Sequence, residues 1–283
     1  MKFAAVKVPP VPAVVLAIIS VQVGAAIAKG LFATLGAAGT ASARIGFSAL
    51  ILFIAVRPNL FRLTAKQWRA VVPYGLALGL MNLLFYYALS RLPMGLAVAL
   101  EFVGPLVLAL AGSRKALDLL WVALAGIGIA LVAPWSGKGV DLVGVIFALS
   151  AGACWAFYIL LSKRAGTQLP GQLAVAVGML CAAILVLPLG IADVDFSRLN
   201  IHILVLGLTL AVFSSVFPFS LEMQALRSMP PRTFSILMSL EPAVAAFLGW
   251  VLLSEQLKFE QWLAILCIVT ASFGVALKRR RSE

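Results

Sequence analysis

Long apolar runs, separated by short polar breaks, make up almost the whole chain. A helix that crosses a bilayer needs about 20 predominantly apolar residues, and ten such runs fit into the 283 residues. The breaks are so short that sequence neighbours should pack antiparallel, residues 91–93 being barely a turn. We predict an all-α polytopic membrane protein with ten transmembrane helices at residues 12–31, 39–56, 70–90, 94–112, 118–134, 142–162, 171–190, 201–224, 233–253 and 259–277.

Two of these runs are near-copies of one another. Residues 88–112 read ALSRLPMGLAVALEFVGPLVLALAG and residues 225–249 read ALRSMPPRTFSILMSLEPAVAAFLG, an offset of 137 residues that maps the fourth predicted helix onto the ninth. Because five helices per half is an odd number, the two halves must enter the membrane in opposite orientations. Inverted halves around a midplane site are a common transporter architecture. We therefore predict two inverted five-helix repeats, residues 1–136 and 137–283.

Composition and charge agree with a membrane location. Hydrophobic residues make up 63% and charged residues 11% of the chain, whereas soluble domains carry roughly 25% charge. The net charge of +12 is spread over short loops, which fits contact with the lipid bilayer and gives no reason to expect a nucleic-acid partner. Lys and Arg concentrate on the face that carries both chain ends, so both termini are predicted to be cytoplasmic. The basic, then apolar, start resembles a signal peptide, but we expect it to be retained as the first helix.

Two carboxylates fall near the centres of predicted helices. An ionised side chain there costs roughly 2.5–3.5 kcal/mol, so Glu101 and Glu241 each need an explanation. Each could bind a substrate ammonium or carry a proton; the alternative is a structural acid hydrogen-bonded to a neighbouring helix or to backbone groups freed by the nearby proline. At the 137-residue offset Glu101 aligns with Met238 and Glu241 with Gly104, so the acids are not symmetric. We expect Glu101 to carry most of the chemistry.

Prolines beside these acids predict hinges. Pro105 and Pro242 each remove a helical hydrogen bond and clash with the preceding turn, so kinks are expected at Gly104–Pro105 and at Pro242.

Other ionisable residues within the runs are candidates for gating or coupling. Lys29 and Arg44 lie one to two turns from the predicted outer face. Lys29 can extend to water, whereas Arg44 could hold a carboxylate or pair with an acid to close an outer gate. Glu222, near the inner end of its helix, could pair with an interfacial arginine or belong to the pathway. Polar and aromatic side chains at comparable depth are candidates for lining a substrate cavity: Gln22, Asn82, Tyr86, Trp155 and Tyr158.

Motifs for enzymatic chemistry are missing from the sequence. It contains no HExxH, GxSxG or phosphate-binding loop, and its three cysteines have no metal-ligand spacing. We expect no enzyme activity, no metal and no cofactor. The energy for transport would come from a substrate or ion gradient, with protons as the candidate coupling ion.

Several segments resemble the EamA-type branch of the drug/metabolite transporter superfamily: VGAAIAKGLF (23–32), GLMNLLFYYALSRLPMGLAVALEFVGPLVLAL (79–110), GACWAFYIL (152–160) and FSLEMQALRSMPPRTFSILMSLEPAVAA (219–246). The resemblance covers nearly the whole chain. It implies two EamA units, cytoplasmic termini, a central cavity and a place in the bacterial inner membrane. Where many EamA units begin with Trp-Gly, this chain has Val23-Gly24. The positions that match are Lys29, Asn82, Glu101, Trp155, Glu222 and Glu241.

The function this implies is export of amino acids, of the threonine or homoserine type and with a range that could include aromatic amino acids, by alternating access. An exporter of drugs, nucleotide sugars or purines with the same fold is the alternative. The single arginine within a span and the six tryptophans argue mildly against a larger or more basic cavity. A channel or a membrane enzyme fits less well.

Overall fold

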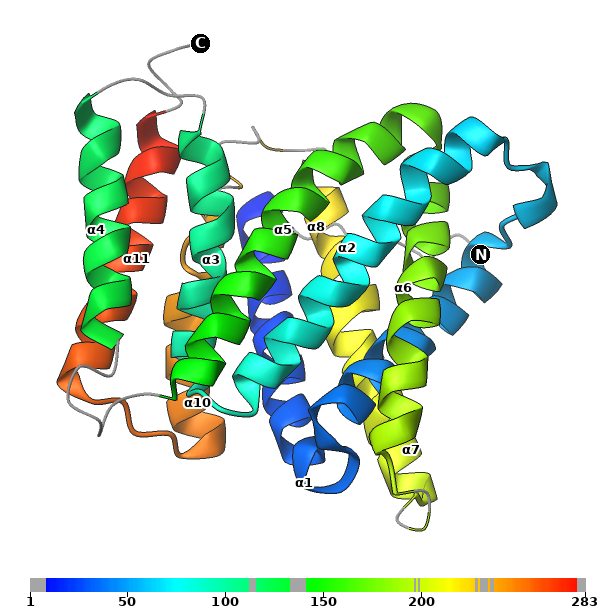
Figure 1. Cartoon of the computed structure of the whole chain (residues 1–283), viewed down its shortest axis with the longest axis horizontal. Coiled ribbons are helices and arrows are strands. Elements are labelled where there is room, and N and C mark those ends of the chain that lie inside the picture. The colour runs from blue at the N-terminus through cyan, green and yellow to red at the C-terminus, as the bar shows by residue number, and fades with distance from the viewer. Residues whose placement is uncertain are drawn as a thin grey trace.

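The computed structural model describes residues 9–111, 116–132, 141–195, 197, 199–226, 229, 234 and 237–278. Every regular element within these residues is helical (Figure 1). The elements are α1 (Pro10–Val56), η1 (Leu60–Arg62), α2 (Ala65–Leu89), α3 (Met94–Leu110), α4 (Ala116–Val132), α5 (Leu142–Gln168), α6 (Gly171–Asp193), α7 (Ile201–Ala211), η3 (Val212–Val216), α8 (Phe217–Leu226), α10 (Glu241–Leu253) and α11 (Phe259–Lys278). The predicted repeat boundary at residues 136 and 137 lies outside the described residues.

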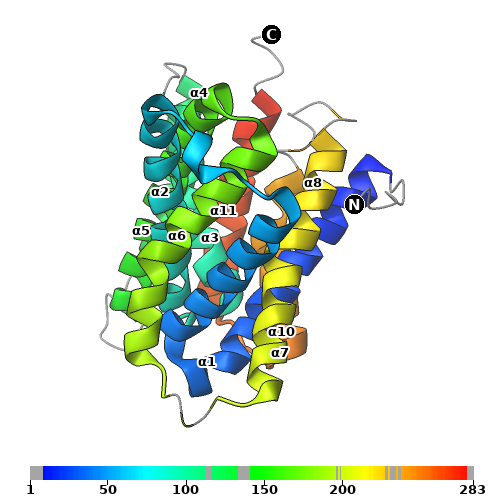
Figure 2. The same ribbon diagram turned by 90° about the vertical axis from the view of Figure 1, so that its right-hand side faces the viewer.

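Helix α1 is broken into two arms at Gly36. This glycine has φ 67° and ψ 176°, a conformation that glycine adopts without the steric cost of a side chain. In Figures 1 and 2 the chain descends along the first arm, turns and rises along the second. The two arms coincide with the helices predicted at residues 12–31 and 39–56.

Elements α7, η3 and α8 follow one another without a break, in the region predicted as one helix over residues 201–224. The middle element is a single wide turn of π-helix. Such turns are rare overall, and many of those that occur lie at functional sites. Here the Phe217 N–H bonds to the Val212 oxygen, five residues back. The carbonyl of Phe213 is thereby left without its usual helical partner.

Packing between helices joins the two predicted halves far more than it joins sequence neighbours. The most extensive contacts are those of α2 with α5, α1 with α6, α3 with α5 and α4 with α11. Sequence neighbours such as α2 and α3, or α5 and α6, touch little. Our expectation that short loops would pair sequence neighbours closely is therefore wrong, because small residues let helices of opposite halves approach instead.

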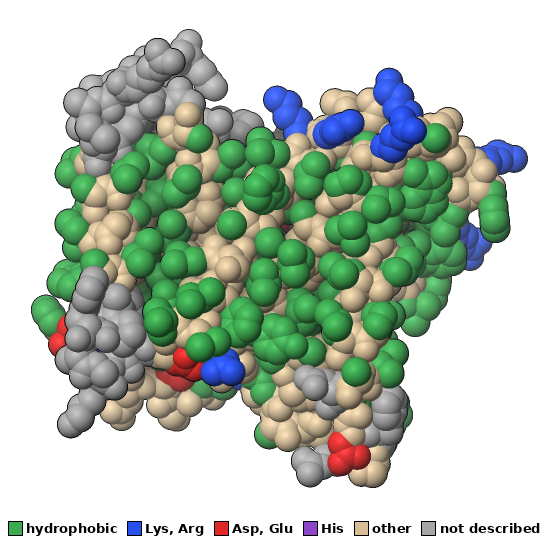
Figure 3. All heavy atoms as spheres, in the orientation of Figure 1, with side chains coloured by type: hydrophobic (Ala, Val, Ile, Leu, Met, Phe, Trp, Pro, Cys, Tyr) green, Lys and Arg blue, Asp and Glu red, His purple; other side chains and the backbone are tan. Residues whose placement is uncertain are grey.

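Within the described part of the chain, four helices are long and apolar enough to cross a membrane: α1, α2, α5 and residues 171–192 of α6. Five further apolar helices are shorter, at residues 94–108, 120–131, 201–216, 241–253 and 259–274. The all-helical fold is thus confirmed for the described residues and is consistent with a membrane protein, whereas the count of ten spans in two repeats stays a prediction. In Figure 3 an apolar belt separates an end rich in Lys and Arg from an end where Asp and Glu lie; we call these the basic end and the acidic end.

Candidate functional site

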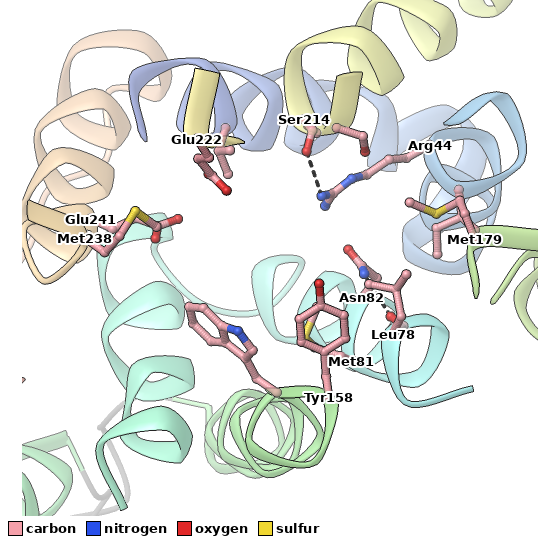
Figure 4. Close-up of a pocket in the computed structure, with 14 residues that line it drawn as sticks. Arg44, Leu78, Met81, Asn82, Tyr158, Met179, Ser214, Glu222, Met238 and Glu241 are labelled. Atoms are coloured by element: carbon pink, nitrogen blue, oxygen red, sulfur yellow. Dashed lines mark hydrogen bonds between the residues drawn. The ribbon is translucent and has the colours of Figure 1, made fainter. Parts of the chain in front are cut away.

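A cavity of about 190 Å³ lies among helices α1, α2, α5, α6, η3, α8 and α10 (Figure 4). Carboxylates, a guanidinium, an amide and aromatic rings all reach it. Its lining consists of Val21, Arg44, Ile45, Leu78, Met81, Asn82, Trp155, Tyr158, Met179, Ser214, Ser215, Glu222, Met238 and Glu241. Five of the predicted site residues therefore come together with Arg44 at one place: Asn82, Trp155, Tyr158, Glu222 and Glu241.

Arg44 is held at the cavity by a carbonyl that the sequence leaves free. Pro218 in α8 has no N–H, so the carbonyl of Ser214, four residues earlier, has no α-helical partner. Arg44 Nη2 donates to this carbonyl oxygen at 3.1 Å. The guanidinium also lies over the Tyr86 ring, 5.7 Å from its centroid. No carboxylate of the described residues forms an ion pair with Arg44, so its charge is available to a ligand.

Ser20 of α1 contacts the wide turn η3 through a further hydrogen bond. Its hydroxyl donates to the Phe213 oxygen at 2.6 Å, the carbonyl that the wide turn frees. Gly24 lies directly against Ser214, where a Cβ would meet the serine backbone nitrogen at 3.3 Å. The glycine of the Val23-Gly24 pair therefore permits close contact between α1 and the wide turn η3.

Carboxylates occupy the part of the cavity that faces Arg44. Figure 4 shows Glu222 and Glu241 on one side and Arg44 on the other. Gln22 Nε2 donates to Glu241 Oε1 at 3.0 Å. Glu241 Oε2 and Gln22 Oε1 are buried without any hydrogen-bond partner. A buried carboxylate oxygen with no donor is costly, so a bound cation or donor would be stabilised there.

Aromatic and amide side chains complete the wall formed by α2 and α5. Tyr158 and Trp155 extend from α5, and the Trp155 ring meets the Phe102 ring edge-on at 4.9 Å. The Tyr158 ring stacks on the Tyr74 ring, with 5.2 Å between the ring centroids. Asn82 Nδ2 donates to the Leu78 oxygen at 2.8 Å, which fixes the amide at the cavity.

Glu101, which we expected to carry the chemistry, is buried but does not belong to the cavity lining. Gln22 and Tyr86 also lie outside the lining, although Gln22 reaches it through Glu241 and Tyr86 supports Arg44. Lys29 is remote from the cavity and pairs with Glu255. The arginines considered as partners for Glu222, at positions 227 and 232, lie outside the described residues.

Predicted hinges have two different structures. Pro105 lies inside α3, which continues through it, and Gly104 packs backbone to backbone against Gly152 of α5. Pro242 lies in the first turn of α10, directly after a turn at residues 239–240. A helix break is therefore present at Pro242 and not at Pro105.

Eight lining residues were not among our predictions: Val21, Ile45, Leu78, Met81, Met179, Ser214, Ser215 and Met238. The signal for Ser214 was present in the sequence, since Pro218 frees its carbonyl. Methionines in apolar runs carry no such signal. Among the described residues no group of three His, Cys, Asp or Glu side chains could hold a metal ion.

The sequence is similar to a known transporter family and to several of its members. The model of the EamA-like transporter family matches residues 142–277. The chain is 44% identical over 274 residues to the threonine/homoserine exporter RhtA of Salmonella typhimurium strain SL1344, covering 96% of this chain and 92% of that one. It is 42% identical to RhtA of Escherichia coli K12, covering 97% and 93%. An uncharacterized transporter of Bacillus subtilis, YwfM, is 29% identical over 57% of this chain and 54% of its own.

One solved crystal structure has a TM-score of 0.61 and 17% identity to this chain; the match covers 97% of this chain and 98% of that one. This likeness concerns the fold alone. Fold and site define an all-helical protein with membrane-length apolar helices and a charged internal cavity, and the family match and the relatives make it a membrane transporter. The chain belongs to the EamA-like transporter family.

Proposed function

We propose that this protein exports amino acids from the cytoplasm, and that the cavity around Arg44 and Glu241 is its substrate site. The observation that carries this proposal is the separation of charge within one cavity, with carboxylates opposite a guanidinium that forms no ion pair with any described residue. A free amino acid carries an ammonium and a carboxylate on adjacent atoms and complements both. The relatives named threonine/homoserine exporters, nearly full-length and 42–44% identical, support the same substrate class.

In this proposal the substrate ammonium lies at Glu241, whose Oε2 has no partner, with Gln22 holding the other oxygen. Glu222 adds negative charge on the same side. The substrate carboxylate lies at Arg44, because guanidinium and carboxylate form strong paired hydrogen bonds. Asn82, Trp155 and Tyr158 would contact the substrate side chain. Glu101 stays a candidate for proton coupling, because it is a buried acid outside the substrate cavity.

Cavity size favours amino acids over the alternative substrates. Pockets for drug-sized ligands measure roughly 300–1,000 Å³, whereas this cavity measures 190 Å³. A nucleotide sugar or a drug would require a larger space. Threonine or homoserine, each with a short side chain, fit a small polar cavity better, and an aromatic amino acid would have to use the ring-lined wall at Trp155.

The architecture that goes with this function is ten spans in two inverted repeats, residues 1–136 and 137–283. If the halves are related by a two-fold axis, each helix contact should have a counterpart between the corresponding helices of the other half. The counterpart of the α2–α5 contact is the contact of α1 with α7 and α8, and α3–α10 and α4–α11 are their own counterparts. All of these contacts are present. The separation of basic and acidic ends supports cytoplasmic termini in the bacterial inner membrane. Movement of the halves about the midplane would expose the cavity to one side at a time.

Exchange in proteoliposomes tests the substrate and its orientation together. Vesicles loaded with radiolabelled threonine are diluted into threonine, homoserine, threonine methyl ester or N-acetylthreonine. Wild-type protein should exchange with the two free amino acids only. Removing one partner of a desolvated charge pair costs about 2–5 kcal/mol, so Arg44→Gln should reduce exchange about 30-fold or more.

Arg57→Gln is the matched control, since Arg57 is an exposed arginine directly after α1. It should exchange at the wild-type rate. Equal exchange of threonine and its methyl ester by the wild type would contradict the proposed binding of the substrate carboxylate. Full exchange by Arg44→Gln would place the substrate elsewhere.

A further inference from the structure

Both ion pairs that the structure records among the described residues lie at the acidic end, and each joins one predicted half to the other. Lys29 of α1 pairs with Glu255, in the connection between α10 and α11. Arg91, after α2, pairs with Asp141, which precedes α5. The segment that links them is the turn at residues 90–93, between α2 and α3.

Glu255 and Lys29 hold this turn from one side with three polar contacts. Lys29 Nζ contacts Glu255 Oε1 and also donates to the Leu92 oxygen at 2.8 Å. The Met94 N–H, the first of α3, donates to Glu255 Oε2 at 2.7 Å. Glu255 therefore satisfies an unpaired amide at a helix N-terminus, where a negative charge is favoured. The side chains of Lys29 and Glu255 are only 20% and 14% exposed, which reduces screening by water and salt.

Arg91 and Asp141 hold the turn from the other side, more weakly. Arg91 Nη1 lies 2.9 Å from Asp141 Oδ2, and the two side chains are 45% and 36% exposed. The hydrogen bond from Arg91 lowers the pKa of Asp141, with further help from the amides of Gly144 and Val143 that Asp141 caps. Exposed pairs contribute little to stability, so the Lys29–Glu255 pair is the stronger connection.

Tight packing closes the space behind the turn. Leu92 and Met94 are buried. A Cβ at Gly95 of α3 would lie 2.5 Å from Ala246 Cα of α10, so these two helices meet backbone to backbone. At the basic end, by contrast, the cavity lining reaches Glu222, one turn before α8 ends. There a neutral hydrogen bond connects the halves, from Gln67 Nε2 to the Gln168 oxygen at 3.2 Å.

We propose that Lys29 and Glu255 form the latch that closes the substrate cavity on its acidic, outer side, with the turn at residues 90–93 as the part that the latch holds. Opening to the outside then requires the pair to separate and the Met94 amide to lose its acceptor. The assignment of the acidic end to the outside rests on the proposed function. The latch is otherwise independent of which substrate is carried.

Accessibility of a thiol in the cavity tests the latch without any transport measurement. In a background with Cys154, Cys181 and Cys267 changed to serine, Ser215→Cys places a reporter in the cavity lining. A membrane-impermeant maleimide is then added to intact cells. With the latch intact, labelling should be slow. Adding Glu255→Gln or Lys29→Met should raise the labelling rate about tenfold, which corresponds to a shift of about 1.4 kcal/mol between closed and open states.

Two controls make the same charge change at other positions of the sequence. Glu260→Gln removes an exposed acid five residues further along the same end. Asp118→Asn removes the acid that the 137-residue offset pairs with Glu255 in the other half. Neither should increase labelling from outside. An equal increase in all four variants would overturn the latch and indicate general loosening.

Cross-linking keeps the test decisive if single variants fold poorly. In the cysteine-free background without the Ser215→Cys reporter, Lys29→Cys with Glu255→Cys, joined by a short bifunctional thiol reagent, should stop amino-acid exchange; a cleavable reagent should allow exchange to recover on reduction. Exchange at the full rate after complete cross-linking would overturn the latch. Failure of the proposed substrate, in contrast, would leave the effect of Glu255→Gln on reporter labelling unchanged.

Discussion

The two proline segments, residues 88–112 and 225–249, have similar sequences and different structures. In the first, α3 continues through Pro105, and its Gly104 lies against Gly152 of α5. In the second, the chain turns at residues 239–240 and α10 begins at Glu241. Met238 and Glu241 occupy the positions that correspond to Glu101 and Gly104, and both line the cavity.

The same two repeat positions are thus closed by packing in the first half and open to the cavity in the second. Residues 101 and 104 are three apart in the continuous helix α3 and lie on one side of it, whereas residues 238 and 241 are separated by the turn at residues 239–240. A glycine at position 104 lets α5 cover that face, whereas a glutamate at position 241 leaves a polar group that needs space. Similar sequences in the two halves therefore differ both in where the helix begins and in what packs against it.

Neutralising the two acids gives the largest expected effect. Glu241→Gln should reduce amino-acid exchange about 30-fold or more, because a desolvated charge partner is worth about 2–5 kcal/mol. Glu101→Gln should reduce exchange less, because Glu101 does not line the cavity. Exchange in proteoliposomes, normalised to folded protein by size-exclusion chromatography, measures both. A larger loss for Glu101→Gln would restore Glu101 as the substrate partner.

Filling the closed face of the first segment should come next in size. Gly104→Ala would place a methyl group against the Gly152 backbone, and overpacking of this kind costs about 1–3 kcal/mol. We expect a lower melting temperature in detergent. Gly126→Ala in α4 is the control, since a Cβ there meets nothing within 4 Å; it should be neutral or slightly stabilising. Equal melting temperatures for both variants would contradict the close contact.

Removing the prolines should have the smallest effect and should separate the two segments. Proline is tolerated in the first helical turn, so Pro242→Ala should leave stability nearly unchanged while allowing the turn at residues 239–240 to become helical. We expect the maximal exchange rate to fall about two- to threefold, roughly 0.4–0.7 kcal/mol in the barrier. Pro105→Ala, inside a continuous helix, should change the rate less. The reverse order would assign the hinge to α3.

Much of the fold follows from local composition. Hydropathy identified the helical segments, including both arms of α1 and the continuous stretch of α7, η3 and α8. It could do so because the free energy of placing a segment in lipid is nearly the sum of the contributions of its residues. The resemblance to EamA-type transporters was also present in the sequence and is confirmed by the family match. Helix count in the membrane, orientation and the roles of single residues stay predictions.

Sequence alone did not determine which residues meet. Hydropathy does not specify how a helix is rotated about its axis or which helix covers a given face, because both depend on packing between residues far apart in the chain. For this reason we expected Glu101 to carry the chemistry, whereas the structure places Glu241 in the cavity and pairs Lys29 with Glu255, 226 positions away. The sequence determined a membrane transporter with acids at mid-helix. Only the tertiary structure decided that Glu241 faces Arg44 across the cavity, whereas Glu101 is buried outside the cavity lining.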